Sequence, residues 1–509
     1  MPTKKNHKFT NDRVSGVLIG AACGDALGAG YEFGPALPAE TNIYMRGQGA
    51  FAPGEWTDDS AQMIAIALAA ASSDIATPAG QESIAKNFLD WYFSPAREKD
   101  IGIHTSQVMR QVTDPDADNL AERFTKVATA KEKRNPGTSG GNGALMRTAA
   151  VALAKLGNEQ ELVDTAIKTA MLTHADPRGA QAAAVWCLAI KEAIETESFT
   201  SQPDLEQLKN NILEAINRTM PSEATFWKEQ LDSATGRDPR EFTSGNGYSV
   251  QTIKCAWAAI THTPIPQPHP AQHLRDALQE AVRAGNDADT VACVAGSLLG
   301  AMWGLSAIPT RWRSQIHGWP NMRDRDLQTL AHNIVNKPEN NQINNQWPNI
   351  NNMDYTGWSG IDTIAIHPHD SDVIISGFNA ASGTVETPKE IDAVVSLCRM
   401  GTDDIRHHKL RPGNHVEVRI IDIPGDNAHT ELTLADAADT VAYFRSQGKT
   451  VLLHCVAAQS RTPTVAALYA IRHKNIDPQA AFNQVNQTLS SAHPNPEFTN
   501  IVLNHKEHS

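Results

Sequence analysis

Two short clusters of oxygen-bearing side chains have residue types and a spacing that suit a chemical role. The first is Thr57-Asp58-Asp59 and the second is Asp287-Ala288-Asp289-Thr290, and each directly precedes a stretch of small, helix-forming residues. Mg²⁺ and similar cations take oxygen ligands in near-octahedral geometry and keep waters that serve as nucleophiles or hold substrate hydroxyls. Together, the clusters predict one hard-metal site.

Helix capping is the competing explanation. Asp and Thr before a helix satisfy free backbone amides, and taken singly each cluster is better explained as such a cap. A cap needs one oxygen, whereas these clusters supply six oxygen-bearing side chains: Thr57, Asp58, Asp59, Asp287, Asp289 and Thr290. The surplus favours a metal site shared by two segments.

A glycine-rich turn, Ser139-Gly140-Gly141-Asn142-Gly143, is suited to bind a diphosphate, because glycine lets backbone amides approach without side-chain obstruction. As an isolated segment it is more often a loop between helices. His174 in Leu172-Thr173-His174 and Tyr248 in Gly245-Asn246-Gly247-Tyr248 are further candidates for substrate contact. Arg147, which precedes an apolar run, is assigned a structural role.

The order of these segments resembles that of the ADP-ribosylglycohydrolase family, whose members include dinitrogenase reductase-activating glycohydrolases. Any one match would be weak, but five in the right order between about residues 10 and 335 are specific. The matching segments are Gly16 to Gly28, Tyr31-Glu32 with Glu55-Trp56-Thr57-Asp58-Asp59-Ser60, Gly141 to Arg147, Leu172-Thr173-His174, and Gly285 to Thr290.

The resemblance implies an all-α domain that cleaves the N- or O-glycosidic bond between ADP-ribose and a protein side chain or a small acceptor. Two divalent metal ions, Mg²⁺ first and Mn²⁺ as the alternative, would be held by the six oxygen-bearing residues. Glu32 would ligate a metal, move a proton or gate entry, with a surface salt bridge as the competing role. ADP-ribose would contact Ser139, Gly141, Asn142, Gly143, His174 and Tyr248.

The composition is that of an ordinary soluble globular protein, with 41% hydrophobic and 20% charged residues among 509. This length predicts two to four domains at about 150 residues each. The formal net charge of −13 argues against a surface that binds nucleic acid by neutralising phosphates, while a local basic pocket stays compatible with it.

Cysteine usage and the N-terminal sequence indicate a cytoplasmic protein. The six cysteines are widely spaced and lie mostly in apolar segments, as buried free thiols do. The basic N-terminus lacks the apolar run and cleavage site of a signal peptide. Residues 14–29 are small and apolar, but they contain Asp25 and are too short to span a membrane. We predict a packed core helix there and no membrane partner.

The chain divides into two differently patterned parts. Residues 10–335 contain Ala-rich helical stretches separated by Gly/Pro loops, which predicts an almost all-helical domain. Residues 336–353 form a polar Asn/Gln/Pro linker without periodicity. In residues 354–509, short strand-like runs alternate with helical stretches, which predicts an α/β domain.

A second chemical site lies in this α/β domain. The strand-like run Val451-Leu452-Leu453 leads into His454-Cys455, then five intervening residues, and then Arg461-Thr462 and a helix. A loop of this length can aim backbone amides at one anion, with the helix N-terminus and a bidentate arginine adding positive charge. The same field lowers a thiol pKa, so Cys455 is a candidate nucleophile that Thr462 supports.

This segment resembles the phosphate loop of cysteine-based protein tyrosine phosphatases, and the short domain is most similar to the dual-specificity subgroup. The resemblance implies a general acid about thirty residues upstream, for which Asp426 is the first choice and Asp422 the second. Ala458 stands where the subgroup usually has glycine. Alanine there leaves open an altered loop, a changed substrate, or a domain that binds phosphate without hydrolysing it.

The sequence therefore predicts a bifunctional hydrolase: a metal-dependent ADP-ribosyl hydrolase followed by a cysteine-dependent phosphatase without a cofactor. Its partners would be an ADP-ribosylated protein or small ADP-ribose conjugate and a phosphorylated substrate. The alternative is a hydrolase whose C-terminal domain only binds phosphate or targets the enzyme. A helical scaffold that binds ADP-ribose without cleaving it is less favoured, because both metal clusters are complete.

Overall fold

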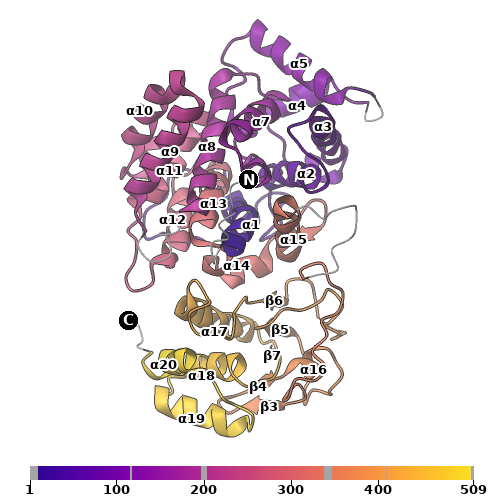
Figure 1. Ribbon diagram of the computed structural model, residues 1–509, viewed down its shortest axis with the longest axis vertical. Coiled ribbons are helices and arrows are strands. Elements are labelled where there is room, and N and C mark those ends of the chain that lie inside the picture. Colours follow the sequence, from indigo (N-terminus) through magenta and orange to yellow (C-terminus); the bar gives the residue numbers. More distant parts are fainter. Residues whose placement is uncertain (1–9, 115–116, 197–202, 337–346, 409, 506–509) are drawn as a thin grey trace. The chain divides into compact units, whose positions relative to one another are not determined.

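The computed structural model describes residues 10–114, 117–196, 203–336, 347–408 and 410–505. The chain divides into two compact units, coloured indigo to salmon and orange to yellow in Figure 1. The first comprises Met1–Ile308 and Gln315–Lys337, and the second Pro309–Ser314 and Pro338–Ser509. Within the predicted linker, residues 337–346 lie outside the described part of the chain.

The first unit is helical, as predicted. Its long segments carry Ala and other strong helix formers between loops that contain Gly and Pro. Its helices are α1 (Thr10–Gly28), α2 (Asp58–Ser72), α3 (Pro78–Tyr92), α4 (Ile103–Met109), α5 (Leu120–Arg134), α6 (Ala149–Ala154), α7 (Glu159–Met171), α8 (Pro177–Glu195), α9 (Leu205–Thr219), α10 (Ala224–Ala234), α11 (Ser249–His262), α12 (His273–Arg283), α13 (Ala288–Trp303) and α15 (Asp324–Val335). A short hairpin joins β1 (His317–Gly318) to β2 (Met322–Arg323).

Helices α1 and α13 pack with their backbones almost in contact at the centre of this unit. A Cβ atom on Gly20 would lie 2.3 Å from the carbonyl oxygen of Gly296, and one on Gly24 would lie 2.0 Å from that of Ala292. Glycines at four-residue spacing therefore form a strip on α1 that faces the equivalent strip on α13. Only the absence of side chains allows this approach.

The predicted core helix is α1. Among the described residues, the segment Asn11–Tyr31 is long and apolar enough to cross a membrane, but all of its apolar window is buried within the protein. Packing against α13 accounts for that composition.

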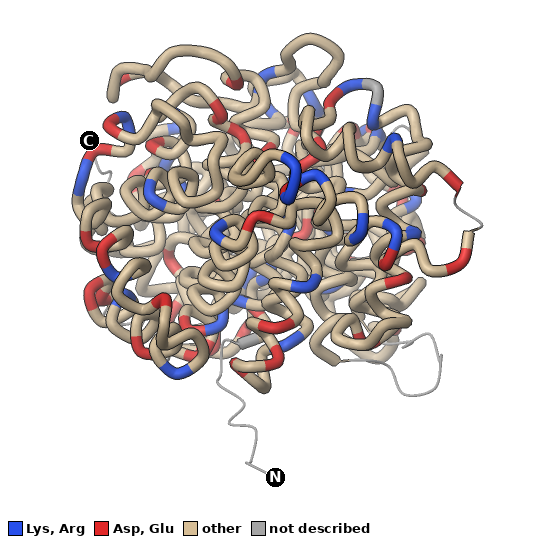
Figure 2. The backbone as a smooth tube through the Cα atoms, turned by 90° about the horizontal axis from the view of Figure 1, so that it is seen from above, with Lys and Arg blue, Asp and Glu red and all other residues tan. Residues whose placement is uncertain are grey.

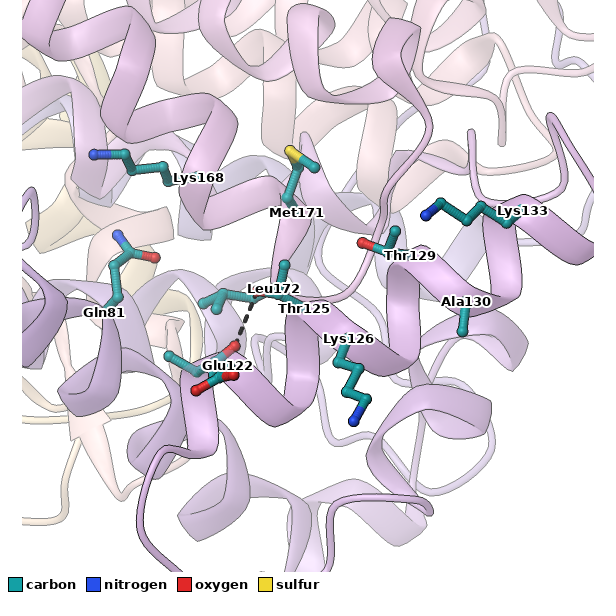
Figure 3. A pocket seen from close by; sticks show the side chains of 11 residues that line it. Gln81, Glu122, Thr125, Lys126, Thr129, Ala130, Lys133, Lys168, Met171 and Leu172 are labelled. Atoms are coloured by element: carbon teal, nitrogen blue, oxygen red, sulfur yellow. Dashed lines mark hydrogen bonds between the residues drawn. The ribbon is translucent and has the colours of Figure 1, made fainter.

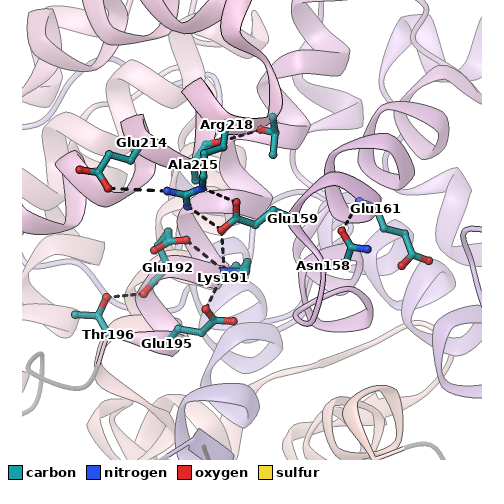
Figure 4. Close-up of polar contacts among 11 residues, drawn as sticks. Asn158, Glu159, Glu161, Lys191, Glu192, Glu195, Thr196, Glu214, Ala215 and Arg218 are labelled. Atoms are coloured by element: carbon teal, nitrogen blue, oxygen red, sulfur yellow. Dashed lines mark hydrogen bonds and ion pairs between the residues drawn. The ribbon is translucent and has the colours of Figure 1, made fainter. Parts of the chain in front are cut away.

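Capping residues fix where several helices begin. The Asp176 side chain accepts a hydrogen bond from the Gly179 amide, and Pro177 occupies the first turn of α8. Apolar periodicity alone does not mark such a polar first turn. Figure 4 shows how α8 is then tied to its neighbours: Lys191 pairs with Glu159 of α7 and with Glu192 and Glu195 of its own helix.

The second unit contains the predicted α/β fold. Its sheet has the order β3-β4-β7-β5-β6, in which β3 is antiparallel to β4 and the remaining neighbours are parallel. The strands are β3 (Ile364–His367), β4 (Asp370–Ser376), β5 (Ala393–Ser396), β6 (His415–Glu417) and β7 (Val451–His454). Strand β7 is central, and all four of its residues are buried.

Helices cover both faces of this sheet. One apolar cluster joins the strands to α17 (Thr430–Ser446), α18 (Arg461–Lys474), α19 (Pro478–Thr488) and α20 (Pro496–Leu503). A second cluster, on alternate strand residues, includes α16 (Phe378–Ala381). Alternate side chains of a strand point to opposite faces, so a parallel strand buried on both sides has a continuous apolar sequence.

The second unit also includes a segment from within the first domain's sequence. Helix α14 (Thr310–Gln315) begins beside Asp436 of α17, which accepts a hydrogen bond of 2.8 Å from the Thr310 amide and another from the Thr310 hydroxyl. Burial raises the pKa of Asp436, because it disfavours the charged carboxylate, and the Thr310 donors offset part of this cost. Residues 309–314 thus complete the C-terminal fold.

Charged residues of both signs are interspersed along the backbone. In the view of Figure 2, Lys and Arg alternate with Asp and Glu over the described residues instead of gathering by sign. The chain's net charge of −13 is therefore spread over many short segments.

Substituting Gly20 with alanine tests the α1–α13 contact. The new methyl group would overlap the Gly296 carbonyl, so we expect the free energy of unfolding of the first unit to fall by about 2 kcal/mol or more. Gly157→Ala is the control, since a Cβ there meets nothing within 4 Å. Calorimetric melting of both variants decides the matter; equal stability would contradict the close approach.

Candidate active sites

The first metal cluster is fixed by a buried carboxylate that sequence reasoning passed over. Asp25 of α1 accepts hydrogen bonds from the amides of Thr57 (3.0 Å) and Ser60 (2.9 Å) and from the Ser60 hydroxyl (2.6 Å). These donors lower the pKa of Asp25, but burial outweighs them and raises it to about 6. Asp25 therefore anchors the first turn of α2, where Asp58 and Asp59 stand.

The second cluster opens α13. Asp287 is the N-cap residue of this helix, but its side chain makes no capping hydrogen bond. Its Oδ2 atom instead accepts a hydrogen bond of 2.8 Å from Nδ2 of Asn142, a residue of the glycine-rich turn. The Asp287 amide donates to Asn246 Oδ1 at 3.3 Å. Three segments far apart in sequence thus meet at Asp287.

One pocket of about 420 Å³ collects most of the predicted residues of the first domain. A ligand oxygen from each of Glu32, Asp287 and Asp289 lies within 4.8 Å of the others. The lining includes Glu32, Asp58, Asp59, Gly141, Asn142, Gly143, His174, Asp287, Asp289 and Thr290. The pocket therefore joins carboxylates, a glycine turn and a histidine.

The second unit places Cys455 at the end of the central strand. The loop that follows β7 leads directly into α18, and Cys455, Ala458 and Thr462 are buried. Ala458 has φ +53°, a left-handed conformation that glycine adopts at less cost. The alanine thus keeps the backbone shape that the loop requires, at a local energetic cost.

Arg461 and Thr462 are held by backbone carbonyls. Arg461 Nη1 donates to Leu397 O at 2.7 Å and to Ile420 O at 3.2 Å. The Thr462 hydroxyl donates to Ser376 O at 3.3 Å, a contact that differs from the predicted support of the thiolate. Arg461 Nε is buried and donates no hydrogen bond to any described residue, so its N–H is available to an anion.

Asp422, the second choice from sequence, is the aspartate tied to this loop. Its Oδ1 atom accepts hydrogen bonds from Ser460 Oγ (2.6 Å) and Asn495 Nδ2 (2.9 Å), and its Oδ2 atom lies 3.8 Å from Arg461 Nε. Asp426 lies beyond an exposed turn whose Gly425 amide donates to Glu497. These contacts place Asp422 against the end of the loop that runs from Cys455 to Arg461.

Comparison with known proteins matches each of the two domains to a family model. The family model described as ADP-ribosylglycohydrolase matches residues 6–344, most of the chain. The chain belongs to the ADP-ribosylglycohydrolase family. A second model, the catalytic domain of dual specificity phosphatases, matches residues 373–508. This member of the family thus carries a dual-specificity phosphatase domain behind its glycohydrolase domain.

Curated relatives align with the glycohydrolase domain. ADP-ribosylarginine hydrolase Tri1 of Serratia proteamaculans is 26% identical over 315 residues, which cover 60% of this chain and 75% of the relative. ADP-ribosylhydrolase ARH3 of Homo sapiens is 28% identical over 339 residues, covering 60% and 90%. A solved structure, an ADP-ribosylglycohydrolase-related protein complex, is 26% identical with a TM-score of 0.46 and covers 65% of this chain and 99% of its own.

Three predicted residues of the glycohydrolase domain lie beside the pocket instead of lining it. Thr57 is the N-cap of α2, and its hydroxyl accepts from the Asp59 amide. The Ser139 hydroxyl donates to Glu132, which shapes the glycine turn from behind. Tyr248 packs over Gly140, where a Cβ would lie 2.2 Å from the tyrosine ring. Thr57 thus contacts a lining residue, Asp59, whereas Glu132 and Gly140 stand outside the lining.

The donor set of the glycohydrolase pocket fits a hard cation. The Oδ1 atoms of Asp59 and Asp289 are buried and have no hydrogen-bond partner among the described residues. Burial, and then repulsion from neighbouring carboxylates, raises the pKa of Asp58, Asp59 and Asp289 well above the ordinary range. A divalent cation would offset that repulsion and supply the missing partners.

Sequence reasoning missed several lining residues, among them Phe33, Asp100 and His104. Burial raises the pKa of Asp100, which shares a hydrogen bond with Asp58. His104 Nε2 donates to Thr173 O at 2.9 Å, and its ring centroid lies 4.6 Å from that of His174. The only local signal was a polar aspartate and histidine around Gly102, just before a short helix.

A second hollow of the glycohydrolase domain has a different character. It measures about 620 Å³ and lies against α3, α5 and α7, as Figure 3 shows. Its lining combines apolar side chains such as Met171 and Leu172 with Lys126, Lys133 and Lys168. Glu122 is the one acidic side chain among its lining residues, so the hollow lacks the donors that the carboxylate pocket offers a metal.

The pH dependence of stability tests the charge of the carboxylate pocket. Burial, then Asp100, Asp287 and Asp25, raises the pKa of Glu32 from 4.5 to about 8. An acid whose pKa rises on folding contributes stability below its unfolded value and loses it as pH climbs towards the folded value. In chelator, we therefore expect the melting temperature to fall between about pH 5 and pH 8.

Added Mg²⁺ or Mn²⁺ should raise the melting temperature more at about pH 8 than at about pH 6, because the ion competes with protons for the carboxylates. Glu32→Gln removes one titrating group and should flatten the chelator profile. An unchanged slope in Glu32→Gln would show that Glu32 is not protonated in the metal-free pocket.

Proposed function

We propose that the chain is a bifunctional hydrolase. Its N-terminal domain cleaves the glycosidic bond between ADP-ribose and a protein side chain or small acceptor, with divalent metal ions, and its C-terminal domain hydrolyses phosphate esters through Cys455. The observation that carries the first activity is the single pocket in which buried carboxylates meet the Gly141 turn and His174. ADP-ribosylated proteins are the partners this implies.

Different residues of the pocket bind different parts of the substrate. The turn at Gly141 and Gly143 leaves room for backbone contact with the diphosphate, and His174 stands against Gly143 on the same side. Divalent ions bound by Asp58, Asp59, Asp287, Asp289 and Thr290 would supply Lewis acidity and hold ribose hydroxyls and a water. Fixing both reactants lowers the entropic part of the barrier.

Glu32 is suited to carry the proton of this reaction. Its raised pKa of about 8 keeps the carboxyl group protonated at neutral pH until a cation or substrate changes its surroundings. A protonated carboxyl can donate to the leaving atom as the bond to the anomeric carbon breaks. The deprotonated group can then take a proton from the incoming water.

Replacing single aspartates tests the hydrolase assignment. We expect Asp58→Asn and Asp289→Asn each to lower release of ADP-ribose from ADP-ribosylated peptides by at least about 100-fold at a fixed Mg²⁺ concentration. Asp90→Asn, on an exposed position of α3, should leave the rate unchanged. Chromatographic detection of ADP-ribose from arginine- and serine-linked peptides provides the measurement. Full activity in either pocket variant would remove the metal role.

Phosphate ester hydrolysis follows from the Cys455 loop. The Cys455 thiolate attacks phosphorus through Sγ, the bond from phosphorus to the ester oxygen breaks, and the Asp422 carboxyl gives its proton to that oxygen. The Asp422 carboxylate then takes a proton from water while the water oxygen displaces sulfur from phosphorus, which releases inorganic phosphate and restores the thiolate and the protonated Asp422. Support for this proposal comes from the contacts of Asp422 with Ser460 and from its approach to Arg461.

A domain that binds phosphate without turnover is the second candidate. Two observations favour it. Ala458 adopts a left-handed backbone conformation at a position where glycine is usual. Arg461 donates hydrogen bonds to the carbonyl oxygens of Leu397 and Ile420. Such a domain would direct the glycohydrolase to phosphorylated partners.

Three substitutions separate turnover from binding. With an aryl phosphate, a phosphotyrosine peptide and a ribose phosphate as substrates, Cys455→Ser should abolish phosphate release. Asp422→Asn should lower kcat by about 100-fold or more, whereas Asp426→Asn should change it less than about threefold. A larger fall in kcat in Asp426→Asn than in Asp422→Asn would make Asp426 the acid instead. Release by none of the chains, with phosphate still bound by the intact protein, would support the binding domain.

We propose that the protein acts in the cytoplasm, because a reducing compartment suits its thiol chemistry. All six cysteines are free and buried, including Cys455. A thiol nucleophile must stay reduced to act.

A further inference from the structure

Arg147 is a buried cation that the proposed chemistry leaves without a role. It follows the short 3-10 turn Asn142–Ala144 of the glycine-rich segment and is completely buried. No carboxylate touches its guanidinium among the described residues. Desolvation lowers the pKa of Arg147 to about 9, and its Nε atom has no hydrogen-bond partner. Burying a cation without a carboxylate partner costs more free energy than burying an apolar side chain of similar size.

The Arg147 guanidinium joins two residues that lead to opposite sides of the pocket. Nη1 donates to Gln62 Oε1 at 2.7 Å, and Nη2 donates to Thr173 Oγ1 at 2.6 Å. The Phe88 ring covers the group, with its centroid 4.5 Å from the guanidinium carbon. The planar fork of arginine presents its donors in one fixed geometry, whereas an ammonium on a flexible stem does not.

On the substrate side, this contact determines the tautomer of His174. The Thr173 hydroxyl lies 2.8 Å from His174 Nδ1 and already accepts a hydrogen bond from Arg147, which has no acceptor atom of its own. The hydroxyl proton must then go to Nδ1, its remaining partner. His174 therefore carries its proton on Nε2, which a Cβ on Gly143 would meet at 3.1 Å.

The charge state of His174 agrees with this arrangement. Burial, then His104 and Arg147, lowers the pKa of His174 well below its ordinary value, so the ring is neutral. A neutral ring has one donor and one acceptor nitrogen. With Nδ1 occupied by Thr173, the ring presents an N–H donor beside the Gly141 turn.

On the metal side, the same contact orients Gln62. Because Arg147 occupies the amide oxygen of Gln62, the amide nitrogen is left to donate, and it does so to Asp58 Oδ2 at 2.8 Å. One carboxylate oxygen of Asp58 is thereby committed to Gln62, and Asp58 also shares a hydrogen bond with Asp100 of the same pocket. Contacts of this kind behind a ligand set its orientation and basicity.

We propose that Arg147 is a positioning residue that sets the donor tautomer of His174 and the ligand orientation of Asp58 from one guanidinium. This rests on the proposed hydrolase function, in which His174 contacts ADP-ribose and Asp58 binds metal. The structural role first given to Arg147 is thereby replaced by one that couples the substrate and metal sides of the pocket.

Variants on each side of Arg147 test this coupling separately, with ADP-ribose and Mn²⁺ as the probes. Thr173→Val should weaken ADP-ribose binding about tenfold and leave Mn²⁺ affinity unchanged, and Thr173→Ser should restore binding. Gln62→Met should weaken Mn²⁺ about tenfold and leave ADP-ribose binding at saturating Mn²⁺ unchanged. Arg147→Lys should weaken both. Calorimetry of the full chain measures each affinity.

The tautomer gives a readout that a packing role would not move. Long-range ¹H–¹⁵N correlation on histidine-labelled protein should show His174 protonated at Nε2, and in Thr173→Val this preference should be lost. Protonation at Nδ1 in the intact chain would overturn the inference, as would equal loss of both affinities in Thr173→Val and Gln62→Met. If the binding and tautomer results hold while no ADP-ribosylated peptide is cleaved, the proposed function fails and the positioning role stands.

Discussion

The contact between the α1 and α13 backbones is the constraint on which the glycohydrolase site depends. The two metal clusters are more than two hundred residues apart in sequence, and each stands at a helix start next to this contact. A Cβ on Gly28 would lie 2.4 Å from Asp289 Cα, so the glycine strip ends against a predicted ligand. Asp25, on the same helix, holds the other cluster. One helix thus gives both halves of the carboxylate pocket their spacing.

Most of the fold and the core of each candidate site could be predicted from the sequence because the signals were local. Asp287-Ala288-Asp289-Thr290 opens a helix, and Cys455 stands between a strand and a helix, so each motif lies within one turn or loop. Asp100 and His104 had no such signal, since their importance comes from contact with Asp58 and Thr173 in other segments. A single sequence shows which residue types are present but not which distant partners they meet.

The same limit applies to Asp422 and Arg147. Spacing favoured Asp426 first and Asp422 second, and the contacts of Asp422 with Ser460 and Asn495 could not be predicted from it. Arg147 precedes an apolar run and was assigned a structural role, but such a run does not show what a buried guanidinium contacts. Polar groups inside a protein take their roles from the donors and acceptors that surround them, and those are supplied by tertiary structure.

Helix α14 makes the boundary between the two domains less simple than one linker. Residues 309–314 belong to the C-terminal unit, although the chain on both sides of them belongs to the N-terminal unit. A truncation that starts after the linker would leave Asp436 buried without the Thr310 donors it accepts. Cutting the chain at the linker would therefore take from the C-terminal domain contacts that residues placed before the linker supply.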